Sequence, residues 1–274
     1  MPRTILLLLS YYVLLTLLPA CYEDVVDCTD PDAANYDLSA DEGCGDCCVY
    51  PTLSLEVRRS FGAAPLQLDS TYTDGSGNAF TLTAFRYYLG DIALTAGDRS
   101  LDLPTDLQEV EFTSGTDTVA AELNVNAILV TTEGSTNYPV GTLPIGEPDL
   151  ASLDLSFGLP DVFTAVLPAS APTDSPLRTQ PRLLNFRDGR GYVQSRVEYV
   201  LAATGEARSV STFGYLPVSL PIPAGVLPPP RGDNFTLTLE ADYAAVLQSV
   251  DLTADSAAVA ADIGGSLPAL LRVQ

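Results

Sequence analysis

The chain has 274 residues, of which 46% are hydrophobic, which suffices for one large domain with a proper core and a small appendage. Its formal net charge is −22 and all 13 basic residues are arginine, so nucleic acid and anionic membrane surfaces are not expected partners. The sequence has no His and no Trp, and its single Met is Met1, which excludes every catalytic or metal site that depends on an imidazole.

Residues 1–20 have the features of a bacterial secretory signal peptide. Arg3 gives a positive start, and residues 5–18 form an apolar stretch too short to span a bilayer. The stretch runs into a Leu-Pro-Ala-Cys motif that ends at Cys21 and resembles the lipobox of bacterial lipoproteins. The resemblance implies cleavage before Cys21 and lipid attachment to its sulfur. The acidic residues Glu23 and Asp24 that follow resemble an export signal of surface lipoproteins, which implies an outer-membrane location on the periplasmic or cell-surface face; a solvated linker explains them equally well. An ordinary signal peptide followed by a structural cysteine is the alternative.

Residues 21–50 form an acidic linker that holds the other four cysteines, Cys28, Cys44, Cys47 and Cys48. Outside the cytoplasm such clusters most often form disulfides, and a segment with so little apolar material needs cross-links to fold. Four cysteines allow three pairings. Because a bond between neighbours Cys47 and Cys48 would be strained, we expect Cys28 to pair with one of these two or with Cys44.

Part of this linker resembles a short repeat of bacterial cell-surface proteins. The matching elements are Cys28-Thr-Asp-Pro, Ala34-Asn-Tyr and Asp41-Glu-Gly-Cys. A zinc site made by thiolates, or a calcium site made by the aspartates of the segment, is the alternative to disulfides. Adjacent cysteines and an oxidising location argue against zinc, and the aspartates lack the spacing of a calcium loop. We therefore expect a disulfide-rich spacer without a metal.

Residues 51–274 are predicted to be one all-β domain, an antiparallel β-sandwich with little helix. Short apolar stretches are separated by Gly, Pro, Asn and Asp. Apolar and polar residues alternate in 53–57, 153–159, 193–201 and 235–241, which is typical of antiparallel strands with one buried face. Helical periodicity is confined to 242–250 and 256–263.

Residues 80–94 form the longest stretch that is both β-prone and rich in aromatic residues, and we expect them to be the central strand. The apolar phase changes twice along it. Phe80, Leu82 and Ala84 lie on one face, Phe85, Tyr87 and Leu89 on the other, and Ile92 and Leu94 on the first again. We interpret this as a strand whose two faces are both partly buried, with a bulge at Gly90.

Several stretches of this domain together match the pattern of one known family. They are 53–57, Pro65-Leu66, 80–94 and 155–160, followed more weakly by Gly191-Tyr192, Val197-Glu198 and the strand that begins at Phe235. On these residues the chain resembles the MbnP-like family, secreted β-sandwich proteins named for a methanobactin-associated copper-binding protein. The resemblance covers most of 52–250, is most specific around Tyr87-Tyr88, and implies a sandwich fold.

The copper site of that family is where the chain departs from it. The family pattern has tryptophans before the Gly-Tyr pair, where this chain has Phe186 and Asp188. A later aromatic-then-His element corresponds to Phe213-Gly-Tyr-Leu216, which has no His. Copper needs imidazole, thioether or thiolate ligands, and none occurs after residue 48. We therefore expect the fold of the family without its metal site, and no cofactor.

Two other groups of residues are candidates for binding. Arg182, Arg187 and Arg190 belong to a cluster between 178 and 196 that forms either an anion-binding patch or local charge balance in an acidic protein. Five tyrosines line a sugar-binding face or, as we expect for strand aromatics, fill the core. They are Tyr87, Tyr88, Tyr192, Tyr199 and Tyr215.

The leading hypothesis is a non-enzymatic, lipid-anchored surface protein with a binding or structural role. Its partner would be an unknown protein or small molecule, in addition to the membrane reached through Cys21. The alternative, implied by the family resemblance, is a copper- or metal-handling protein that works with a dihaem protein. A carboxylate hydrolase is a third class, and the spacing of the aspartates gives it no support.

The lipobox generates the first prediction. Substitution Cys21→Ser removes the sulfur that would carry the lipid, so the protein should leave the membrane fraction and lose labelling by a fatty-acid probe. Fractionation and labelling identical to those of the unchanged protein would contradict the lipoprotein hypothesis.

Overall fold

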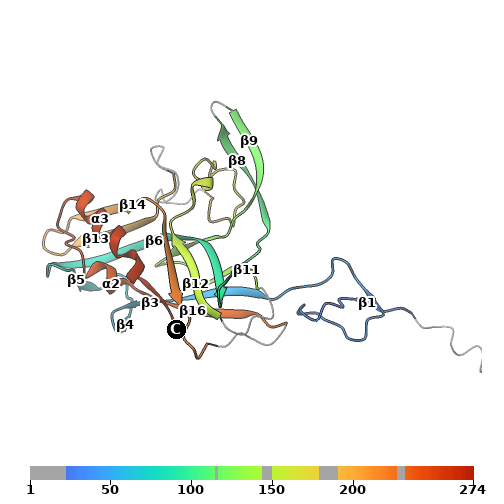
Figure 1. Ribbon diagram of the computed structural model, residues 1–274. Coiled ribbons are helices and arrows are strands. Elements are labelled where there is room, and N and C mark those ends of the chain that lie inside the picture. The colour runs from blue at the N-terminus through green and yellow to red at the C-terminus, as the bar shows by residue number, and fades with distance from the viewer. Residues whose placement is uncertain (1–22, 115–116, 144–149, 179–190, 227–231) are drawn as a thin grey trace, which may run out of the picture. The chain divides into compact units, whose positions relative to one another are not determined.

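The computed structural model describes residues 23–114, 117–143, 150–178, 191–226 and 232–274 (Figure 1). Cys21, Arg182, Phe186, Arg187, Asp188 and Arg190 lie outside these residues. The chain forms two compact units, Met1–Tyr50 and Pro51–Gln274. No helix among the described residues is both long and apolar enough to cross a membrane.

The first unit is a small cross-linked segment. Its two short strands, β1 (Val26–Asp27) and β2 (Glu42–Gly43), pair in parallel. Cys28 is bonded to Cys48, and Cys44 to Cys47, so neighbours Cys47 and Cys48 are not bonded to each other. This connectivity is one of the three that four cysteines allow.

Hydrogen bonds reinforce the same unit where apolar burial is scarce. Among its described residues only Cys28 and Ala33 are buried hydrophobics. The Asn35 side chain donates to the Cys47 carbonyl over 2.9 Å and accepts the Val49 N–H over 2.7 Å. The Cys28–Cys48 disulfide joins the two ends of the segment and the Asn35 bonds join its middle to its C-terminal end, which explains how it folds with almost no core.

The second unit is a β-sandwich, which confirms the fold predicted from the sequence. Among the described residues its larger sheet has eight strands in the order β14-β13-β6-β12-β15, with β5, β7 and β10 also paired to β6. Their bounds are β5 (Thr71–Thr73), β6 (Ala79–Ala96), β7 (Arg99–Asp102), β10 (Ala127–Thr131), β12 (Leu150–Phe157), β13 (Ser195–Leu201), β14 (Ala207–Thr212) and β15 (Leu216–Pro221).

The smaller sheet has the order β11-β3-β16-β17, with β4 paired to β3. One pair departs from the predicted antiparallel arrangement, because β3 and β16 pair in parallel, which a hairpin connection would not allow. The bounds are β3 (Thr52–Phe61), β4 (Ala64–Pro65), β11 (Asn137–Thr142), β16 (Phe235–Asp242) and β17 (Leu271–Val273). Both sheets contribute residues to one buried cluster, which is the core of the sandwich.

The remaining described elements lie outside the two sheets of the sandwich. A separate hairpin is formed by β8 (Leu107–Ser114) and β9 (Asp117–Asn124), and two helices follow β16 in the predicted places, α2 (Tyr243–Leu247) and α3 (Ser256–Ser266). Asp255 caps α3 by accepting the N–H groups of Ala257 and Ala258. Helix α3 lies against β14 (Figure 1). Two single-turn helices are η1 (Asp161–Phe163) and η2 (Leu267–Ala269).

Strand β6 is the central strand, as predicted, and both of its faces are buried in its middle, where Tyr88 belongs to a second buried cluster. The changes of apolar phase along it, however, come from two bulges. The pairing with β13 skips Thr83, and the pairing with β12 sets Asp91 and Ile92 of β6 opposite one residue. Each of these two β-bulges adds one residue to β6 and therefore shifts the alternation by one. As a result the apolar residues on both sides of each bulge belong to the same core cluster, namely Phe80, Leu82, Phe85, Tyr87, Leu89, Ile92, Leu94 and Ala96.

The bulge predicted at Gly90 is also placed one residue too early. Gly90 keeps its strand partners, and the left-handed residue is Asp91, with φ of 47°. Gly90 has another role, because a Cβ there would lie 3.2 Å from the Gly158 carbonyl oxygen and 3.3 Å from the Ser156 hydroxyl. The glycine favours this close approach, because a Cβ would require the neighbouring strand to shift by a few tenths of an ångström.

The disulfide pairs generate the second prediction. Mass spectrometry of non-reduced, freshly isolated protein should detect peptides linked Cys28–Cys48 and Cys44–Cys47 and no alkylatable thiol among the four, because the bonds close the unit. Four alkylatable thiols, or zinc retained stoichiometrically, would contradict the pairing.

Candidate functional site

The larger sheet has a break beside the middle of β6. Strand β13 pairs with residues 80–87 of β6, and β12 pairs with residues 89–96 on the same side. Tyr88 lies between the two and bonds to both segments. Its N–H donates to the Gln194 carbonyl over 3.1 Å, and its own carbonyl accepts the Gly158 N–H over 3.0 Å. Gly158, where the chain leaves the sheet after β12, and Gln194, where it returns before β13, therefore both lie beside Tyr88.

The segment Phe213-Gly-Tyr spans this break on the outer side. It connects β14, which pairs with β13, to β15, which pairs with β12. Gly214 has φ of 122° and Gly158 has φ of 87°. A Cβ at Gly158 would clash with the Gly214 carbonyl oxygen, so only glycine permits the two segments to approach this closely.

Tyr88 and Tyr192 close one face of the break. Their rings are 5.7 Å apart and perpendicular, and they belong to a second buried cluster outside the main core. The Tyr88 hydroxyl donates to the Pro176 carbonyl over 3.1 Å, and the Tyr192 hydroxyl donates to the Leu177 carbonyl over 3.0 Å. Burial raises the pKa of both phenols well above the ordinary value, so both remain neutral donors.

Four of the five candidate tyrosines are therefore core residues, since Tyr87 and Tyr199 are buried in the main cluster. Tyr215 differs from them, because 45% of its surface is exposed. Its hydroxyl donates to the Asp91 carboxylate over 2.5 Å, and this hydrogen bond is the main cause that raises the pKa of Tyr215. The bulge in β6 thus fixes the orientation of an exposed aromatic ring.

Beside the break an open cleft of about 770 Å³ lies between β14, the spanning segment and α3. None of the fourteen described residues that line it is charged. Small residues on α3 leave the space open. The lining residues are Gln194, Ser209, Val210, Ser211, Thr212, Phe213, Gly214, Tyr215, Leu216, Ser256, Ala257, Ala260, Ala261 and Gly264.

Gln194 is the most buried polar group of the cleft, with 4% of its surface exposed. Its Nε2 donates to the Phe157 carbonyl over 3.3 Å. Because a carbonyl can only accept, the amide nitrogen must face Phe157 and the oxygen Oε1 is directed elsewhere. Oε1 lies toward Gly264, 4.0 Å from the position of a Cβ there, and no described residue donates a hydrogen bond to it.

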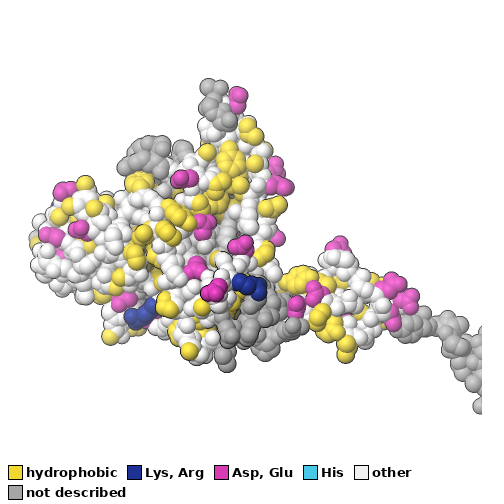
Figure 2. Space-filling view, in the orientation of Figure 1, with side chains coloured by type: hydrophobic (Ala, Val, Ile, Leu, Met, Phe, Trp, Pro, Cys, Tyr) yellow, Lys and Arg dark blue, Asp and Glu magenta, His cyan; other side chains and the backbone are white. Residues whose placement is uncertain are grey.

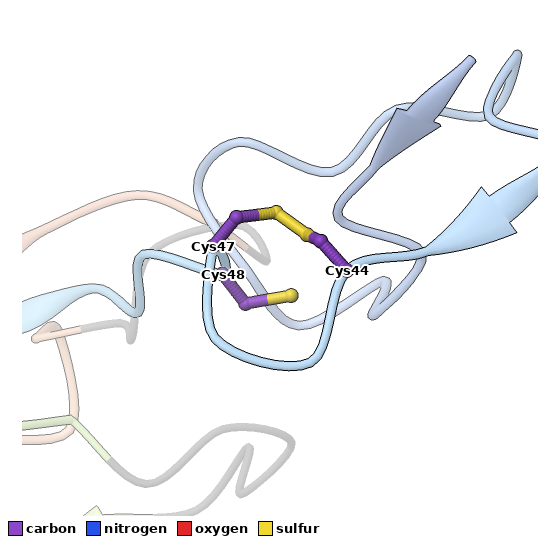
Figure 3. A group of neighbouring side chains, drawn as sticks. All are labelled: Cys44, Cys47 and Cys48. Carbon is purple, nitrogen blue, oxygen red and sulfur yellow. A yellow bond between two sulfur atoms is a disulfide. The ribbon is translucent and has the colours of Figure 1, made fainter.

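The cleft does not fit the copper that the family resemblance implies. Its described lining has no imidazole, thiolate, thioether or carboxylate, and the nearby Asp91 carboxylate already accepts the Tyr215 hydroxyl. Soft donors occur only in the first unit, where the sulfurs of Cys44, Cys47 and Cys48 lie within 4.8 Å of one another (Figure 3). All three are in disulfides, so they do not offer thiolates.

The described part of the predicted arginine cluster consists of its two ends. Arg178 donates to the carbonyls of Ala169 and Ala171 over 2.6 Å each. Arg196 forms an ion pair with Glu198 over 2.9 Å. Both guanidinium groups therefore have partners within the protein, and the ion pair of Arg196 is an instance of the local charge balance weighed from the sequence.

Sequence inspection did not identify the cleft. Its residues come from three segments that are brought together by strand pairing, and Gln194 carries no motif. One signal was present, because Ala257, Ala260, Ala261 and Gly264 repeat at the spacing of one helix face and leave that face without bulk.

Comparisons with known proteins give two matches. A family model described as MbnP matches residues 50–262. Among solved structures, MbnP from Methylosinus trichosporium is 15% identical over 74% of this chain and 79% of its own, with a TM-score of 0.42. No curated protein matches the sequence.

The ligand inventory generates the third prediction. Residues 22–274 with both disulfides intact, incubated with copper and dialysed against a mild chelator, should retain no stoichiometric copper by elemental analysis. The remaining oxygen donors hold copper weakly and without selectivity. One copper retained per chain would contradict this and would point to ligands outside the described residues.

Proposed function

The chain belongs to the MbnP family over residues 50–262, and from this premise we propose that it is a non-enzymatic, lipid-anchored binding protein of the cell envelope whose ligand occupies the cleft beside the sheet break. The lipobox at Cys21 supports the anchor, and the outer membrane is the proposed location. The two disulfides agree with an oxidising compartment.

One observation carries the binding role, namely a cleft with an oriented acceptor, Gln194 Oε1, to which no described residue donates. A ligand that displaces solvent from the cleft must donate to this oxygen, because a polar group left buried without a partner costs about 1–3 kcal/mol. The cleft volume lies in the range of about 300–1,000 Å³ that is usual for small-molecule sites.

The chemistry of the cleft supports binding over catalysis. A serine nucleophile needs a base within hydrogen-bond reach, and the described lining has no His, Asp, Glu or Lys. The Asp91 carboxylate near the cleft is not a free base, because it accepts the hydrogen bond that orients Tyr215. The ligand is proposed to be a small molecule, or a group presented by a protein partner, and the acidity of the chain disfavours nucleic acid.

A metal-handling role beside a dihaem protein remains the alternative that follows from family membership. The described residues of the sandwich provide no soft donor set for it. The proposed binding role rests instead on Gln194 and the other uncharged residues that line the cleft.

Hydrogen exchange tests the proposal even while the ligand is unidentified, and this is the fourth prediction. Residues 22–274 are compared alone and with a cell-envelope extract of the source bacterium. The extract should slow amide exchange in segments 209–216 and 256–264, which line the cleft. Unchanged exchange in both segments, or protection confined to residues 23–50, would contradict a binding role for the cleft.

A further inference from the structure

We propose that the cleft selects a neutral saccharide. This inference rests on the proposed function, because it assumes that the cleft binds a ligand, and it goes further by naming the chemical class.

Charge provides the first selection. The chain has 35 acidic and 13 basic residues, and acidic side chains are scattered over the visible face of the sandwich (Figure 2). The described lining of the cleft has neither acidic nor basic side chains. An anionic ligand would meet the negative field of the protein without a counter-charge, and a cation would find no carboxylate among these residues. A neutral ligand avoids both costs.

The floor of the cleft requires a hydrogen-bond donor. The Gln194 amide is held by its bond to the Phe157 carbonyl, so Oε1 faces the cleft in one orientation. An apolar ligand would bury this oxygen without a partner. A hydroxyl group donates to it and keeps its own acceptor capacity for the serine hydroxyls of the wall, Ser209, Ser211 and Ser256.

The rim offers an aromatic platform. Tyr215 is exposed over 45% of its surface, and its bond to Asp91 restricts the ring without using its face. A saccharide ring has C–H groups on its faces and hydroxyl groups on its edge, so it packs on an aromatic ring while its hydroxyls reach polar groups. Opposite the platform, Ala257, Ala260 and Gly264 leave room for a ring to enter.

Two neighbouring glycines of α3 provide a matched pair of variants. A Cβ at Gly264 meets only Thr212 Cγ2 at 3.8 Å, Thr212 Cβ at 3.9 Å and Gln194 Oε1 at 4.0 Å. The Cβ of Gly264→Leu therefore fits without a clash, and the rest of the leucine side chain fills the floor of the cleft. A Cβ at Gly265 meets nothing within 4 Å, so Gly265→Leu points into open space. Both changes replace glycine by a better helix former, so neither should unfold the helix.

The fifth prediction uses a glycan array with neutral, sialylated and sulfated members, followed by calorimetry with the neutral glycan that binds best. The unchanged protein should bind neutral glycans in preference to acidic ones. Gly264→Leu should weaken binding at least about tenfold, which corresponds to about 1.4 kcal/mol, and Gly265→Leu should leave it unchanged. Cooperative thermal unfolding of both variants serves as the folding control.

Tyr215 provides an independent test if Gly264→Leu does not fold. Tyr215→Ala removes the platform and should weaken binding at least about tenfold, whereas Tyr215→Phe retains the ring and should weaken it less. Equal losses in the two variants would assign the effect to the Asp91 bond and contradict the platform.

The inference is overturned if no neutral glycan binds, if acidic glycans or a short peptide bind more tightly, or if Gly264→Leu binds as the unchanged protein does. Should the envelope extract still protect segments 209–216 and 256–264 while no neutral glycan binds, the cleft remains a binding site and only the saccharide assignment fails.

Discussion

The whole sandwich depends on one constraint, that an 18-residue strand must keep a single apolar face against the core while it pairs on both edges. A regular strand twists, and so long a strand would turn its inner face away from the opposing sheet. The bulges at Thr83 and at Asp91-Ile92 interrupt β6 and reset its alternation. The second bulge places Asp91 at φ of 47°, a conformation that costs about 1 kcal/mol outside glycine and that Asp tolerates comparatively well.

The same strand determines where a site can form. Because β12 and β13 share one edge of β6, the sheet must have a gap at Tyr88, and the backbone of Tyr88 bonds to a segment on each side of it. The glycines at 90 and 158 allow the adjoining strands to close on this point. Its buried face is filled by Tyr88 and Tyr192, and the cleft opens beside the segment Phe213-Gly-Tyr. A rigid frame thus carries a lining that has hydroxyl, amide and aromatic groups in place of metal ligands.

The sequence was sufficient for the strands, the two helices and the absence of soft ligands, because alternation, Ala-rich stretches and composition are local properties. It was insufficient for the bulges of β6, since burial of both faces and an inserted residue each change the apolar phase, and both occur in this strand. Gly90 was mistaken for the bulge because a glycine inside a strand indicates either a bulge or a close approach, and only the position of Gly158 decides between them. The cleft could not be predicted from the sequence, because its lining comes from segments that only non-local strand pairing brings together, namely Gln194, residues 209–216 and α3.

The central claim is that the break in the larger sheet is a rigid frame for the cleft. Native-state hydrogen exchange, resolved for single amides, tests it most directly. The amides of Tyr88 and Gly158, whose bonds join the two sides of the break, should exchange as slowly as the amide of Val197 within β13. If both exchange as fast as the amide of Gly225 in an exposed turn, the strands fray at the break, and the account of the site is contradicted.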